Sequence, residues 1–326
     1  MRILFAGSPG IAVPSLEALF TLAGTDGGFE LAGVLTNPDS PRGRRGTPEP
    51  TELGAAAERL SVRRTEAGKP PVPALKPAKL DAAAREAVSA LKPDLLVSFA
   101  YGRIFGPKFL ALFPLGGINI HPSLLPKYRG AAPIPAAILN RESLTGLSIQ
   151  KLAAEMDSGD ILARENILLN GRETAAVLGK TVARKAAELL PRVLGALAAG
   201  TAESLPQNHG EATYCFPIPK EEGLIDWSGS AAEIDARIRA FDPWPRTWTI
   251  REGQRLLILR AEVPDGLPSA EVPGTVLGVD KQRGILVQTG EGILAVQELQ
   301  YGAKKALDWK VFLNGSRNFI GSRLGA

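Results

Sequence analysis

Residues 94–100 read Asp-Leu-Leu-Val-Ser-Phe-Ala, a short run that is almost entirely apolar. Such a run, with hardly any polar position, is typical of a strand buried on both faces, as in parallel sheets. Similar short runs, which we interpret as further strands, occupy residues 3–6, 31–36, 117–121 and 146–152. Segments that we interpret as helices lie at residues 13–20, 53–60 and 81–91. Strands that alternate with helices predict an α/β fold with a doubly wound, mostly parallel sheet.

The character of the sequence changes after a helical, Ala- and Leu-rich segment at residues 174–199. Residues 200–219 are polar and contain prolines, which is typical of a linker. Short β-rich segments separated by turn residues follow at 248–250, 255–261, 274–277, 284–288 and 292–299. This spacing predicts a small OB-like β-barrel. We therefore expect two domains: 1–205, which includes the start of the linker, and 206–326.

Composition limits the classes of function. The chain has 326 residues, of which 44% are hydrophobic and 22% charged, a balance typical of a soluble globular protein. A single cysteine, Cys215, excludes an internal disulfide and a cysteine-based zinc site and favours a reducing compartment. His121 and His209 are the only histidines, so a multi-histidine metal site is excluded as well. Because Gly-Ser-Pro-Gly at 7–10 breaks the apolar start and no stretch approaches about 18 apolar residues, we expect neither a signal peptide nor a membrane span, and a cytoplasmic protein without a metal.

Unusual residues are densest at positions 116–133. Asn119 and His121 lie two positions apart at the end of a predicted strand, so their side chains face the same way. In open α/β sheets ligands bind at the carboxyl ends of strands. An amide and an imidazole there can both donate to one carbonyl oxygen, which acyl transfer needs for its developing oxyanion. Asp157, just past the next strand, offers a third polar group.

Each feature also has a purely structural interpretation. A single histidine at a strand end is more often a structural residue than a catalyst, and Asp157 beside Ser-Gly can form an ordinary Asx turn. Three motifs together, however, resemble the folate-dependent formyltransferases. They are Asn-x-His-x-Ser-Leu-Leu-Pro at 119–126, Arg-Gly-Ala-Ala-Pro at 129–133 and Met-Asp-x-Gly-Asp at 156–160.

The resemblance implies specific roles for these residues. The catalytic set would be Asn119, His121 and Asp157. The folate-binding residues would be Ser123, Leu124, Leu125, Pro126, Tyr101, Gly102, Arg103 and Ile104. The formyl donor would be 10-formyltetrahydrofolate, a co-substrate that is consumed, with no permanently bound cofactor.

Further motifs resemble the branch of the family that acts on methionyl-tRNA. Two of them lie in the first predicted domain, at 5–9 and 36–44, and four in the second, at 225–228, 238–245, 273–275 and 302–305. They imply that the acceptor is the α-amino group of initiator methionyl-tRNA, a step of translation initiation. The implied tRNA-binding residues are Arg42, Arg44, Arg45, Lys304 and Lys305. A mildly basic chain, with a formal charge of +4, is consistent with contact to a polyanion. We expect a monomer that binds no DNA.

A free α-amino group has a pKa near 7.7–8.0, so part of it is neutral and nucleophilic at pH 7. The amine therefore needs little activation, and the demanding part of the reaction is the tetrahedral intermediate with its oxyanion. We assign Asn119 and a protonated His121 to the oxyanion, and Asp157 to the orientation of His121 and to proton transfer.

Three alternatives remain open. A sugar-nucleotide or purine formyltransferase leaves the second domain unexplained. A dinucleotide-binding oxidoreductase would have Gly-x-Gly-x-x-Gly where residues 7–10 read Gly-Ser-Pro-Gly. A non-catalytic RNA-binding barrel leaves Asn119, His121 and Asp157 without a role.

Overall fold

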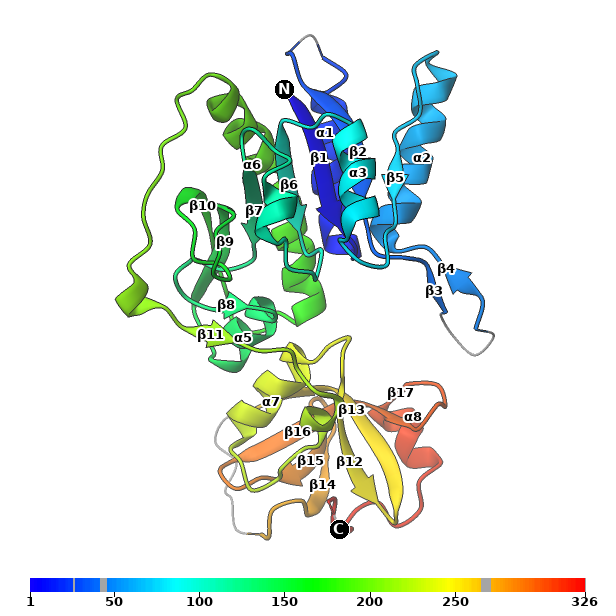
Figure 1. The fold of residues 1–326 in the computed structure, drawn as a ribbon. Helices are drawn as coiled ribbons and strands as arrows, with labels where there is room; N and C mark the ends of the chain where they lie inside the picture. Colours follow the sequence, from blue (N-terminus) through cyan, green and yellow to red (C-terminus); the bar gives the residue numbers. More distant parts are fainter. Residues whose placement is uncertain (26, 42–45, 265–270, 326) are drawn as a thin grey trace. The chain divides into compact units, whose positions relative to one another are not determined.

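The structure, a computed structural model, describes residues 1–25, 27–41, 46–264 and 271–325 (Figure 1). By their contacts they form two compact units. The first unit consists of Met1–Pro133, Leu144–Leu168 and Gly179–Cys215. The second consists of Ile134–Ser143, Leu169–Leu178 and Phe216–Ala326.

The first unit is built on a seven-stranded sheet with the order β10-β9-β7-β6-β1-β2-β5. The strands are β1 (Arg2–Gly7), β2 (Glu30–Leu35), β5 (Ala74–Leu75), β6 (Leu95–Phe99), β7 (Gly117–His121), β9 (Leu144–Lys151) and β10 (Ile161–Leu168). The five strands from β7 to β5 run parallel, whereas β9 runs antiparallel to both of its neighbours, β7 and the edge strand β10. The predicted mostly parallel sheet is confirmed. The edge strand β10 was missed because several of its residues are polar and partly exposed.

Helices lie alongside this sheet (Figure 1). They are α1 (Val13–Leu22), α2 (Glu52–Glu66), α3 (Ala82–Ala90), α4 (Pro107–Leu110) and α6 (Ala175–Ala198). The side chains of Thr51 and Asp81 cap α2 and α3 by accepting a hydrogen bond from Gly54 N and Ala84 N, at 2.9 and 3.1 Å. Every residue of β6 is buried, as expected for a central strand covered on both faces.

The second unit contains an antiparallel sheet with the order β12-β13-β16-β15-β14, and β17 pairs with β16. The strands are β12 (Thr247–Arg251), β13 (Gln254–Glu262), β14 (Val276–Asp280), β15 (Gly284–Gln288), β16 (Ile293–Tyr301) and β17 (Leu307–Asp308). A second, β-rich domain is therefore confirmed.

This unit also contains helices, which we did not expect: α5 (Pro133–Leu139) reaches into it, and α7 (Ala231–Ala240) and α8 (Trp309–Asn314) lie in it. In α7, Ser230 and Glu233 form a capping box that starts the helix. Ile234 and Ile238, one turn apart, then enter the core of the unit. This short helical signal was overlooked among the stronger β signals.

The segment predicted as a linker is partly ordered in the first unit. After the short helix η2 (His209–Glu211), strand β11 (Tyr214–Cys215) pairs in parallel with β8 (Arg129–Gly130). A second small ribbon joins β3 (Ser40–Pro41) to β4 (Pro48–Glu49). None of the helices in the described residues has the length and apolar character needed to cross a membrane.

Candidate active site

A cavity of the first unit lies at the carboxyl end of β7 and has a volume of about 510 Å³, a size usual for small-molecule sites. Asn119, Ile120 and His121 line it from β7, and the side chains of Asn119 and His121 both approach Asp157. Neighbouring strands present Ser98, which pairs with Asn119 from β6, and Gln150, which pairs with it from β9. Asp157 lines the same cavity, so the structure brings the three predicted catalytic residues together.

The Asp157 carboxylate is the centre of this group. Its Oδ1 accepts hydrogen bonds from Gln150 Nε2 at 2.9 Å and from Asn119 Nδ2 at 3.4 Å. Its Oδ2 accepts from the backbone N–H of Gly130 at 2.9 Å and lies 3.5 Å from His121 Nδ1. Donors to both oxygens fix the orientation of the carboxylate.

His121 is only 3% exposed, and both ring nitrogens face a defined partner. Its Nε2 lies 2.8 Å from the carbonyl oxygen of Tyr128. Because a carbonyl oxygen only accepts, Nε2 must donate, which leaves Nδ1 toward Asp157. Burial lowers the pKa of His121, while Asp157 and the Tyr128 carbonyl raise it, and the net direction is downward. A lowered pKa favours a neutral imidazole in the free protein, in which Nδ1 would be the unprotonated nitrogen, and the protonated ring that we expected stays a prediction.

Four of the predicted folate-binding residues, Tyr101, Gly102, Arg103 and Ile104, also line the cavity. Asn37 Nδ2 donates to the Tyr101 carbonyl at 2.9 Å, and Arg103 donates to two carbonyl oxygens, of Pro77 and Ala78. The segment is thus held by hydrogen bonds on both sides, and its backbone borders the cavity. Contact with folate stays a prediction.

The other four, Ser123, Leu124, Leu125 and Pro126, are not among the residues that line the cavity. Ser123 and Leu125 are buried inside their own loop. Ser123 Oγ donates to the Lys127 carbonyl at 2.6 Å, and Leu125 N donates to Ser148 Oγ at 3.1 Å. In the structure these residues shape the loop beside His121, and a direct contact with folate stays a prediction for them as well.

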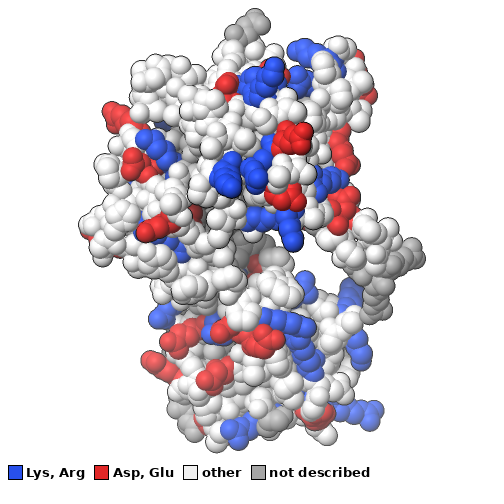
Figure 2. All heavy atoms as spheres, viewed as in Figure 1, with Lys and Arg blue, Asp and Glu red and all other residues white. Residues whose placement is uncertain are grey.

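The predicted tRNA-binding residues that the structure describes do not line this cavity. Arg42, Arg44 and Arg45 are outside the described residues, between β3 and β4. Lys304 and Lys305 are exposed in the loop between β16 and β17 of the second unit. On the face seen in Figure 2, the basic side chains of that unit gather toward β12, β13 and α8, and the acidic ones toward α7. This distribution is compatible with a polyanion along one side of the unit.

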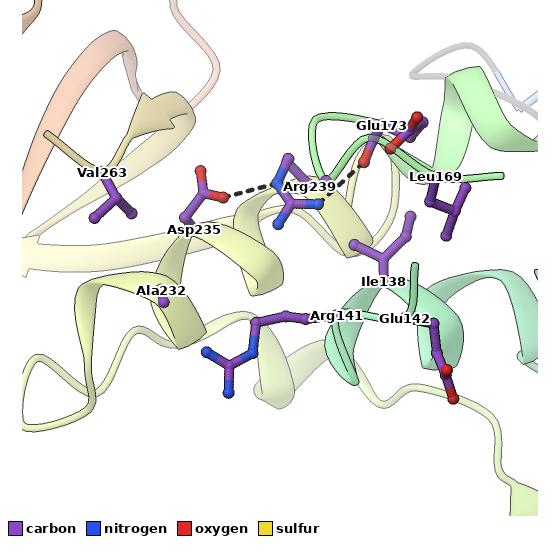
Figure 3. Close-up of a pocket in the computed structure, with 10 residues that line it drawn as sticks. Ile138, Arg141, Glu142, Leu169, Glu173, Ala232, Asp235, Arg239 and Val263 are labelled. Atoms are coloured by element: carbon purple, nitrogen blue, oxygen red, sulfur yellow. Dashed lines mark hydrogen bonds and ion pairs between the residues drawn. The ribbon is translucent and has the colours of Figure 1, made fainter. Parts of the chain in front are cut away.

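The second unit has a smaller cavity of about 180 Å³ (Figure 3). There Arg239 Nε donates to Asp235 Oδ2 at 2.7 Å, and Arg239 Nη1 donates to the Glu173 carbonyl at 3.3 Å. Burial raises the pKa of Asp235, against the lowering effect of Arg239. Because this guanidinium already joins α7 to residue 173, we interpret the cavity as structural. In the described part of the chain, no cluster of three or more His, Cys, Asp or Glu residues suits a metal ion.

Sequence reasoning missed three residues that contact Asp157: Gln150, Gly130 and Gln207. A signal existed for Gln150, because it lies within the strand predicted at residues 146–152, shortly before Asp157. Gly130 belongs to the Arg-Gly-Ala-Ala-Pro motif at 129–133, but the role of its backbone N–H gives no signal in the sequence. Gln207 lies in the segment that we interpreted as a linker, and nothing in the sequence distinguishes it.

The fold and the polar groups of the cavity are compatible with acyl transfer, and comparison with known proteins identifies the family. A family model described as "Formyl transferase" matches residues 1–194, and one described as "Formyl transferase, C-terminal domain" matches residues 217–317. A methionyl-tRNA formyltransferase from Treponema denticola is 47% identical over 326 residues, which cover 98% of each chain. One from Treponema pallidum (strain Nichols) is 44% identical and covers 100% of this chain and 99% of its own length. The chain therefore belongs to the formyl transferase family and, within it, to the methionyl-tRNA formyltransferases.

A solved structure adds a comparison of the fold. HypX from Aquifex aeolicus, in complex with tetrahydrofolic acid, matches 98% of this chain with a TM-score of 0.63 and 19% sequence identity. The chain spans about half of that protein, since the match covers 48% of it. At this identity the likeness concerns the fold alone.

Proposed function

We propose that the chain transfers the formyl group of 10-formyltetrahydrofolate to the α-amino group of initiator methionyl-tRNA, as a monomer in the cytoplasm. One observation carries the chemistry: Asn119, His121 and Asp157 meet in one cavity, where Asn119 Nδ2 donates to Asp157 Oδ1 and His121 Nδ1 lies 3.5 Å from Asp157 Oδ2. The acceptor follows from the end-to-end similarity to methionyl-tRNA formyltransferases.

In the reaction the amine nitrogen attacks the formyl carbon, and the carbonyl oxygen becomes an oxyanion. Asn119 Nδ2 carries two hydrogens, of which one points to Asp157 Oδ1. The other is available for the oxyanion, which such a donor stabilises most in a site shielded from water. Collapse of the intermediate breaks the bond to the folate nitrogen and gives the formamide.

The amine must lose one proton during this step, and the folate nitrogen must gain one. A neutral His121 has an unprotonated Nδ1 that can accept the proton of the attacking amine. Asp157 Oδ2, 3.5 Å away, stabilises the imidazolium that forms. The same proton then goes to the leaving nitrogen, so the step is balanced and the resting state is restored. We therefore assign His121 to proton transfer and Asn119 to the oxyanion.

We propose that the two substrates bind to separate surfaces. The backbone of residues 101–104 would contact the pterin ring, because it borders the cavity. Arg42, Arg44 and Arg45, with Lys304 and Lys305, would contact tRNA phosphates, which fix position without reading sequence.

The test is a formylation assay with 10-formyltetrahydrofolate and three acceptors: methionyl-tRNA, free methionine and a UDP-amino sugar. We expect product from methionyl-tRNA and little from the other two, because only tRNA can contact the basic residues of both units. Faster formylation of the amino sugar would favour the alternative acceptor class, and no transfer to any acceptor would contradict the proposal.

A further inference from the structure

Gln207 is a buried amide on the segment that follows α6, with only 6% of its surface exposed. Its Nε2 donates to three oxygens around the site. They are Oε1 of Gln150 at 3.1 Å, the carbonyl of Asp157 at 2.9 Å and the carbonyl of Gly159 at 2.7 Å. A single side chain thus contacts the backbone of Asp157 and the amide that donates to its carboxylate.

The orientation of this amide is determined by Arg129, which is 2% exposed. Arg129 Nε and Nη2 donate to Gln207 Oε1 at 3.1 and 2.7 Å. A guanidinium only donates, so the oxygen of Gln207 must face Arg129 and the nitrogen must face Asp157. If Gln207 Oε1 turned away, the buried guanidinium of Arg129 would lose this acceptor at a cost in free energy. The arrangement is therefore rigid.

The orientation continues to the carboxylate. Because Gln150 Oε1 accepts from Gln207, Gln150 Nε2 must point the other way, where it donates to Asp157 Oδ1 at 2.9 Å. Asp157 also has a φ of 52°, a backbone conformation that most residues avoid. The bond from Gln207 to the Asp157 carbonyl helps to hold that conformation.

The same segment reaches Asp157 by a second route. Arg129 N donates to the Thr213 carbonyl at 2.8 Å, and Ala131 N donates to the Cys215 carbonyl at 3.1 Å. These two bonds flank Gly130, whose N–H donates to Asp157 Oδ2. Residues 207–215 therefore constrain both oxygens of the carboxylate from outside the cavity.

We infer that Gln207 is a positioning residue for formyl transfer, which orients the Asp157 carboxylate through Gln150 and through the backbone of Asp157. The inference rests on the proposed function, since it takes Asp157 to be catalytic. Gln207 is not among the residues that line the cavity, so its effect should be on the chemical step and not on the binding of either substrate.

Two variants of the full chain test this. Gln207→Glu keeps the acceptor for Arg129 but removes the donor to Gln150 and Asp157. Gln207→Met removes both at similar volume. We expect kcat to fall about 10- to 100-fold, the usual loss when a residue that orients a catalytic group is removed or the group is slightly displaced. KM for both substrates should stay within about twofold of the wild-type value. Ser204→Ala is the matched control, because Ser204 is on the same segment but donates to Asp160, which is half-exposed.

A second readout separates positioning from general stability. In an Asp157→Asn background, Gln207→Glu should cause no further loss of kcat, because the group that it orients is already altered. Losses that multiply in the double variant would overturn the inference, as would a wild-type kcat in both single variants. If thermal melting shows that neither single variant folds, the inference is also overturned, and Gln207 is then a structural residue. An inactive wild type would instead contradict the proposed function.

Discussion

At the scale of single residues, the chemistry depends on the two nitrogens of one buried imidazole. The backbone carbonyl of Tyr128 occupies Nε2 of His121, so only Nδ1 can exchange a proton with a reacting group. Asp157 faces that nitrogen and is itself oriented by Gln150 and Gly130. Burial lowers the pKa of His121, and the nearby Asp157 raises it by stabilising the imidazolium.

Replacing Asp157 with Asn should lower the single-turnover rate by about two to four orders of magnitude, in line with the loss of acid–base or electrostatic support. The amide cannot stabilise an imidazolium, and its nitrogen cannot accept from Gly130 or Gln150. His121→Ala should give a loss of similar size. Asp160→Asn is the control, because Asp160 is half-exposed and pairs with Lys151 and Ser204. A near-normal rate for Asp157→Asn would contradict the assignment.

The pH dependence of stability follows from the lowered pKa of His121. In the unfolded chain this histidine gains a proton near its ordinary pKa of about 6.5, whereas in the folded protein it stays neutral to lower pH. The unfolded state thus binds more protons, so stability should fall as the pH drops below about 6.5. Urea unfolding between pH 5 and 8 measures this. His121→Gln should reduce the slope, and an unchanged slope would show that His121 does not titrate as expected.

At the scale of elements, the short pair β8–β11 is the feature on which the site depends most. It is only two residues long on each side, yet it brings Gly130 N to Asp157. Gly130 has a φ of 116°, and a Cβ built on it would overlap the Cys215 carbonyl oxygen. Glycine is required here both by the backbone angle and by the close approach of β11.

Gly130→Ala should therefore both destabilise the protein and slow catalysis. The angle alone costs about 1–2 kcal/mol, and the overlap with β11 adds to it. The bond from residue 130 to Asp157 should lengthen and kcat should fall. Gly171→Ala is the matched control: its φ is 81°, but a Cβ there would have no atom within 4 Å. It should lose stability through the angle alone and keep kcat. Equal effects of the two on kcat would contradict this view of β8–β11.

At the scale of the whole molecule, the candidate catalytic residues and the lysines proposed to contact tRNA lie in different units. The cavity and every residue of the candidate catalytic group lie in the first unit. The second unit contributes exposed basic side chains, among them Lys304 and Lys305. In their loop, Gln300 Nε2 donates to the Lys304 carbonyl at 2.7 Å, so the backbone is held without either lysine side chain.

Lys304→Ala together with Lys305→Ala should raise KM for methionyl-tRNA and leave KM for 10-formyltetrahydrofolate unchanged. Each lost phosphate contact should also reduce the slope of log affinity against log salt by about one. The measurement is tRNA binding at several salt concentrations. Lys281→Ala, an exposed lysine in the turn between β14 and β15, is the control for net charge. Unchanged tRNA binding at low and moderate salt would exclude this loop from the tRNA surface.

Much of this organisation could be predicted from the sequence. The strand predicted at 117–121 has the same bounds as β7, and its period of two correctly directed Asn119 and His121 to one side. The mostly parallel sheet and the β-rich second domain followed from local periodicity, because burial imposes a pattern on each strand separately. Family motifs added Asp157, which no periodicity would have selected.

Tertiary structure alone decided the rest. Gln207 contacts Asp157 across 50 residues of sequence, and no periodic pattern marks its segment, because a buried polar residue outside a regular element leaves no signature. The protonation of His121 likewise depends on burial and on a carbonyl seven residues away. Local sequence determines which elements form, since burial acts on each of them. Hydrogen-bond partners and the pKa of a buried group are set only when distant segments meet, because both depend on the surroundings in space.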